Sequence, residues 1–162
     1  MEKYNKSISN NGKDSKNAKS IKNSQNALLF HMEDAKAEKL SRVLARLGIA
    51  ARRVEPEEYG LPLGLLAGLP GSFLLAGRDR IFGSGAEGAF GPKEAEVDQE
   101  MLVFSGLTGR ELDRALSSMR GAGVSGIALK AVLTETNRFW NARQLIWELK
   151  REHEAMRKGP GE

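Results

Sequence analysis

Cysteine is absent from this 162-residue chain. Without thiols the protein cannot form disulfides, thiolate zinc sites or iron–sulfur clusters, and it has no cysteine nucleophile. Long apolar runs are also missing, because glycines and prolines interrupt residues 61–75, the longest apolar stretch. The first 26 residues lack the apolar core of a signal peptide. We therefore expect a cytoplasmic protein with no membrane segment, no metal and no cofactor.

Excess charge is absent from most of the chain, although the net charge is +4. Residues 1–26 carry six lysines against Glu2 and Asp14, which leaves 19 basic and 19 acidic side chains in the remainder. This tail is rich in Asn, Lys and Ser, and its composition predicts a disordered basic extension. Binding to nucleic acid is therefore not expected of the body and stays open only for the tail.

The remaining residues, 27–158, are predicted to form one α/β domain. Its first half, residues 27–82, begins with a strand at Ala27 and continues with a helix over 34–47 that has Asp34 as N-cap. A second strand over 49–54, a stunted helix over 61–67 and another strand over 72–76 follow. Residues 83–100 are rich in glycine and then in acidic residues, which predicts a flexible loop between the halves.

The second half, residues 101–158, has clearer boundaries. A strand over 101–106 precedes Thr108 and Glu111, which form a predicted capping box for a helix that ends at Gly121 or Gly123. A strand over 127–133 leads to a last helix, for which Asn141 and Gln144 provide a second capping box. Trp140 and Leu145 occupy the positions of a hydrophobic staple.

The two halves have the same order of elements, namely strand, amphipathic helix, strand and second helix. This order predicts a degenerate duplication of a βαβα unit, with Phe30 and Phe104 in matching places. Strands joined by a helical crossover are parallel. We therefore predict a two-layer α/β sandwich around a mostly parallel sheet.

Residues 129–140 carry a distinctive motif, Leu-Lys-Ala-Val-Leu-Thr-Glu-Thr-Asn-Arg-Phe-Trp. Through this motif, residues 101–154 resemble an uncharacterised bacterial family of domains of unknown function, number 3783 of that series. The first half resembles it more weakly. The resemblance implies a bacterial protein and brings no catalytic residue, cofactor or partner.

Polar residues at strand ends are the leading candidates for a ligand site. Open α/β sheets bind ligands outside the carboxyl ends of their strands. The candidates are Ser105, Thr108, Lys130, Thr134, Thr136 and Asn137, with Arg138 and Arg143 as nearby positive charges. The alternative is that Thr and Asn serve only as turn and cap formers.

Other motifs carry weaker signals. Gly83–Gly88 matches a dinucleotide-binding pattern by letter, but Gly91 and Pro92 leave no room for the helix that must follow. His31 and His153 have no ligand partners at metal-binding spacing. Phe139, Trp140 and Trp147 are candidate interface residues.

The sequence contains no recognisable catalytic constellation, which argues against an enzyme without excluding one. The leading hypothesis is a non-catalytic interaction or regulatory module whose partner is another protein. The alternative is a domain that binds an anionic metabolite or nucleotide at residues 134–137, and a third hypothesis is nucleic-acid contact through the basic tail.

Overall fold

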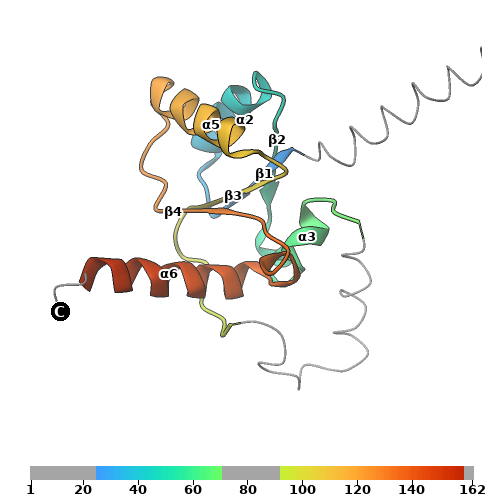
Figure 1. Cartoon of the computed structure of the whole chain (residues 1–162), viewed down its shortest axis with the longest axis vertical. Coiled ribbons are helices and arrows are strands. Elements are labelled where there is room, and N and C mark those ends of the chain that lie inside the picture. The colour runs from blue at the N-terminus through green and yellow to red at the C-terminus, as the bar shows by residue number, and fades with distance from the viewer. Residues whose placement is uncertain (1–24, 71–91, 159–162) are drawn as a thin grey trace, which may run out of the picture.

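The computed structural model describes residues 25–70 and 92–158. Its centre is a four-stranded sheet in the order β2-β1-β3-β4 (Figure 1). The strands are β1 (Asn26–Phe30), β2 (Ala50–Val54), β3 (Met101–Ser105) and β4 (Leu129–Val132). The predicted strand over 72–76 and the Gly83–Gly88 motif lie outside the described residues.

Strand direction divides the sheet into two halves. β1 pairs with β2 in parallel, and β3 pairs with β4 in parallel. The central pair, β1 and β3, is antiparallel, with Leu28 opposite Val103. The predicted mostly parallel sheet is thus present, but the carboxyl ends of β1 and β2 lie at one end of the sheet and those of β3 and β4 at the other.

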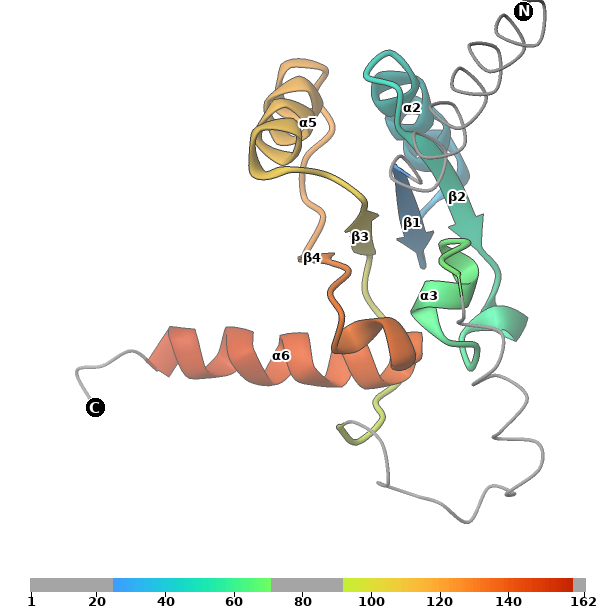
Figure 2. The same cartoon turned by 45° about the vertical axis from the view of Figure 1, so that its right-hand side comes forward.

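Helices cover both faces of the sheet (Figures 1 and 2). The α/β class is confirmed, but the arrangement has three layers where two were predicted. One face carries α2 (Asp34–Ala45) and α5 (Gly109–Gly121), and the other carries the short α3 (Leu63–Leu66) and the long α6 (Ala142–Lys158). The reason lies in the central strands: all five residues of β3 are buried, so both of its faces require cover.

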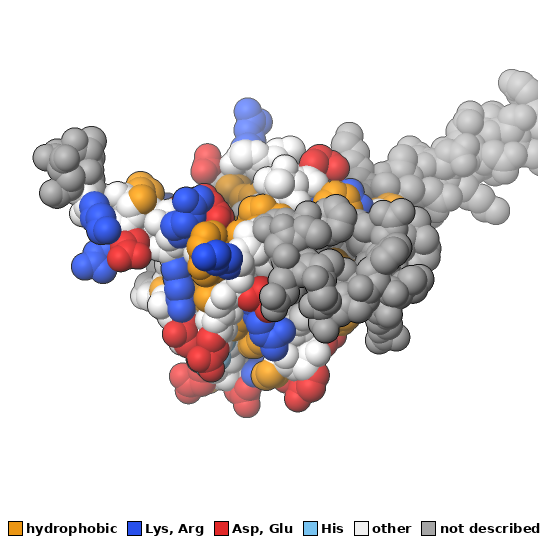
Figure 3. All heavy atoms as spheres, turned by 90° about the horizontal axis from the view of Figure 1, so that it is seen from below, with side chains coloured by type: hydrophobic (Ala, Val, Ile, Leu, Met, Phe, Trp, Pro, Cys, Tyr) orange, Lys and Arg blue, Asp and Glu red, His pale blue; other side chains and the backbone are white. Residues whose placement is uncertain are grey.

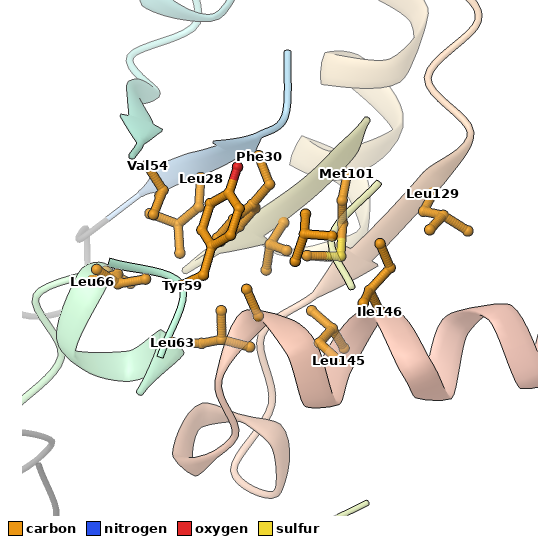
Figure 4. Close-up of a cluster of buried hydrophobic side chains, with 14 residues drawn as sticks. Leu28, Phe30, Val54, Tyr59, Leu63, Leu66, Met101, Leu129, Leu145 and Ile146 are labelled. Carbon is orange, nitrogen blue, oxygen red and sulfur yellow. The ribbon is translucent and has the colours of Figure 1, made fainter. Parts of the chain in front are cut away.

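Alternating residues of the central strands enter two separate cores. Leu28 and Phe30 of β1 face α3 and α6, whereas Ala27 and Leu29 face α2 and α5. On the α3/α6 side the rings of Phe30 and Tyr59 pack at 5.8 Å between centroids. Figure 4 shows this core, in which side chains from both halves of the chain converge.

The duplication is visible in the backbone as an offset of 75 residues. Gly48 and Gly123, which follow α2 and α5, both have φ of 79°. The N-caps of the same helices, Glu33 and Thr108, are also 75 positions apart. Each half then has a short 3-10 helix, η1 (Pro56–Glu58) or η2 (Asn137–Phe139), before its second helix.

Phe30 and Phe104 are not equivalent, so that prediction was wrong. Phe30 belongs to the core beneath α3 and α6, and Phe104 belongs to the core beneath α2 and α5. The offset of 75 instead makes Ser105 the counterpart of Phe30. A shift of one residue reverses which face of a strand a side chain occupies.

The helix starts follow the sequence closely in the second half. Thr108 and Glu111 form the predicted capping box at 2.7 and 3.2 Å, and Asn141 and Gln144 form the other, with both bonds at 2.9 Å. In the first half Asp34 is the first residue of α2 and not its cap. Glu33 is the N-cap, and its side chain makes no capping bond.

Candidate functional site

The predicted strand-end turn, residues 134–137, is closed by its own hydrogen bonds. The N–H of Thr134 donates to Asn137 Oδ1 at 2.7 Å, and the N–H of Asn137 donates to Thr134 Oγ1 at 3.1 Å. Asn137 Nδ2 donates to the carbonyl of Val132 at 3.1 Å. Asn137 is only 8% exposed. Both of these predicted ligand residues therefore have a structural role in fixing the turn between β4 and η2.

The other four predicted ligand residues lie in four different elements or their caps. Ser105 is buried at the end of β3, and Thr108 caps α5. Lys130 lies within β4, and its Nζ donates to the carbonyl of Ile127, away from the turn. Thr136 is the exposed N-cap of η2 and makes no capping bond. Strand direction brings Ser105 and the turn to one end of the sheet, but none of the six residues lines the cleft described below.

Of the predicted interface residues, Phe139 ends η2, Trp140 follows it, and Trp147 lies in α6. Phe139 is 43% exposed, with the Arg138 guanidinium 5.2 Å from its ring centroid. Trp140 packs against the core, and the half-buried Trp147 lies beside the Arg151 guanidinium. Figure 3 views the molecule from the α6 side and shows apolar side chains between lysine and arginine side chains.

A cleft of about 510 Å³ lies at the opposite end of the sheet. It opens beside the carboxyl ends of β1 and β2, between the segments that follow these strands. The chain leaves β1 for α2 on one face, whereas it leaves β2 for η1 and α3 on the other. A crevice forms at such a divergence, and α/β proteins commonly bind ligands there.

Both polar and apolar groups line this cleft. The apolar walls come from Leu29, Met32, Val54 and Pro56, and the polar groups come from His31, Glu33, Arg53, Glu55, Tyr59 and Glu100. All but Glu100 belong to the first half of the chain. The cleft thus joins the loop after β1, the end of β2 and the start of η1 to the residue before β3.

His31 has the most unusual backbone in the cleft. Its φ is 53°, the only positive φ of a residue other than glycine within the described ranges. A left-handed conformation places Cβ close to the following carbonyl oxygen and costs about 1–2 kcal/mol. The N–H of His31 donates to the Tyr59 hydroxyl at 3.2 Å, which ties this loop to the segment after β2. Burial raises the pKa of the Tyr59 phenol, so this group is neutral at physiological pH.

Two charged residues of the cleft, Arg53 and Glu100, already form ion pairs. Arg53 forms an ion pair with Asp34 and also donates to the carbonyl of Met32 at 3.3 Å. Lys36 holds Glu100 at 2.6 Å, with both side chains about one quarter exposed. The charges of Arg53 and Glu100 are therefore each balanced by a partner within the protein.

The ligand site predicted from the sequence, at residues 134–137, lies at the other end of the sheet from this cleft. From the sequence, His31 was considered only as a metal ligand, and it has no partners at metal-binding spacing. Among residues 25–70 and 92–158, no three histidine or carboxylate side chains are placed to hold a metal ion. The missed signal is that β1 and β2 also end in polar residues, His31 and Glu55. Which face the next element takes could not be read from that pattern.

The fold and cleft define the class as a three-layer α/β domain built from two βαβα units. A family model described as Domain of unknown function (DUF3783) matches residues 100–156. The match confirms the resemblance seen in the motif and covers almost the whole second unit. No curated protein and no solved structure gives a significant match. Within the described residues, no helix combines the length and apolar character needed to cross a membrane.

Proposed function

We propose that this protein is a non-catalytic regulatory module that binds a small molecule in the cleft at the carboxyl ends of β1 and β2. The observation that carries the proposal is the left-handed backbone of His31 at the mouth of a cleft. Strained residues that persist in a fold concentrate at sites where function requires them. The cleft volume, about 510 Å³, suits a small metabolite.

The cleft favours binding over catalysis. His31 has no carboxylate or hydroxyl hydrogen-bonded to its ring among the described residues, so no nucleophile–base pair is assembled there. The Asp98 carboxylate is hydrogen-bonded to Lys150, which is the main cause of its lowered pKa, and His31 is the smallest of the causes. These arrangements suit recognition of a ligand whose binding changes the position of the loop after β1.

The chain offers a direct test because it has only two histidines. His31 lines the cleft, and His153 lies on the exposed end of α6. The imidazole signals in NMR spectra of the full chain should respond to a metabolite mixture at His31 and not at His153. His31→Gly identifies the signal. Equal shifts of both signals, or of neither, would exclude a ligand site in this cleft.

A second candidate function is association with another copy of the chain through α6. The helix projects beyond the sheet in both views (Figures 1 and 2), and residues 151–158 are all exposed. Its apolar stripe continues from Leu149 to Met156, which is 82% exposed. Glu148 and Glu152 share one flank by helical spacing and Arg157 the other, which suits a parallel pair of helices.

Sedimentation equilibrium of the full chain tests this second candidate. A dimer that dissociates in Met156→Glu, while Ala155→Glu on another side of the helix keeps it, would support the proposal. A monomer throughout the accessible concentration range would overturn it. The predicted partnership with a different protein, nucleic-acid contact through the tail, a bacterial origin and a cytoplasmic location remain expectations from the sequence.

A further inference from the structure

The internal duplication provides a comparison for each residue of the cleft. His31 corresponds to Gly106, which also has a positive φ, 78°. Glu33 corresponds to Thr108, whose side chain caps α5, whereas Glu33 makes no capping bond. At two positions of the same loop, the second unit therefore has the residue that stabilises the fold and the first unit has a charged or titratable one.

Both of these exceptional side chains line the cleft. Glycine adopts a positive φ without steric cost, and threonine at an N-cap satisfies a backbone donor that is otherwise left without a partner. Proteins accept less stable residues where a binding site requires them. The pair His31 and Glu33 thus identifies the loop after β1 as the ligand-contacting element, on grounds that do not depend on the size of the cleft.

The charges of the cleft define the ligand it suits. Arg53 is paired with Asp34, and Glu100 is paired with Lys36. The carboxylates of Glu33 and Glu55 also line the cleft, and neither forms an ion pair within the described residues. The Glu55 carboxylate accepts one backbone N–H at the start of η1, which leaves a second oxygen available.

We propose that the cleft binds a small organic amine, with the ammonium group held between the carboxylates of Glu33 and Glu55 and the remainder against His31, Met32 and Pro56. This inference rests on the proposed function and specifies its ligand class. A carboxylate or phosphate ligand would meet two uncompensated negative charges, whereas an ammonium group would compensate them. The Tyr59 hydroxyl, which accepts from the His31 N–H, also lines the cleft and holds the loop after β1 in place.

The experiment is a titration of the full chain followed by the two histidine signals at constant pH. The probes are 1,4-diaminobutane as the amine, and inorganic phosphate and succinate as anions of similar size. We expect the amine to shift the His31 signal with a saturable curve and to leave His153 unchanged. Glu33→Gln and Glu55→Gln should each weaken binding about fivefold, the equivalent of about 1 kcal/mol for a partly exposed ion pair.

Glu57→Gln is the matched control, because Glu57 is an exposed neighbour in η1 that does not line the cleft. If this variant weakens amine binding as much as Glu33→Gln, the effect is a general attraction to surface carboxylates of this region and the inference fails. If phosphate or succinate shifts His31 and the amine does not, the ligand class is wrong although the cleft still binds small molecules. If no probe shifts His31, both the ligand class and the proposed site fail.

Discussion

His31 and Gly106 occupy the same place in the two halves of the chain, and both have positive φ, 53° and 78°. Only glycine adopts this conformation without steric cost, so His31→Gly should stabilise the fold. Relief of strain exceeds the extra chain entropy of glycine by about 0.5–1 kcal/mol. His31→Ala keeps Cβ and should give little of this gain. Urea unfolding measures both variants, and a less stable His31→Gly protein would contradict the strain.

Asn137 should be required for stability and not for ligand binding. Its buried side chain makes two hydrogen bonds that close the turn after β4, one from the Thr134 N–H and one to the Val132 carbonyl. We expect Asn137→Ala to lower the free energy of unfolding by about 2–3 kcal/mol, because buried backbone groups lose their partners. Asn137→Asp keeps the acceptor for Thr134 and should cost less. A ligand whose affinity falls in folded Asn137→Ala protein would instead favour a site at this turn.

Tyr59 should couple the two loops of the cleft through its hydroxyl. Tyr59→Phe keeps the ring beside Phe30 but removes the acceptor for the His31 N–H, at a cost of about 1 kcal/mol. Since burial raises the phenol pKa in the folded state, the wild-type protein should lose stability as pH rises above about 10. Unfolding curves at neutral and alkaline pH should show a smaller alkaline loss for Tyr59→Phe.

Glu111 should contribute stability that acid removes. Its carboxylate accepts hydrogen bonds from the Thr108 N–H and from Gln25, which lower its pKa in the folded state. This contribution is present above the ordinary carboxyl range and disappears as pH falls through the lowered pKa. The stability difference between wild type and Glu111→Gln should therefore shrink from pH 7 to pH 3. Asp113→Asn, an exposed change on the same helix, is the control.

Helix capping could be predicted from the sequence because it depends on residues a few positions apart. Thr108 with Glu111, and Asn141 with Gln144, form capping boxes as predicted, since both partners lie within one helical turn. The α/β class followed from alternating strands and amphipathic helices. The duplication was also predicted from the order of elements, but its register was not. Phe30 and Phe104 were matched because both are aromatic, although they lie on opposite faces of the sheet.

The sequence by itself determined the element types, the second-half helix caps and the repeated order of the two units, because these depend on composition and short-range spacing. Only the tertiary structure decided that β1 and β3 pair antiparallel, which sends the carboxyl ends of the two units to opposite ends of the sheet. That single pairing separates the turn at Asn137 from the cleft at His31. It depends on which strand edges meet across the core, a long-range choice that no local pattern encodes.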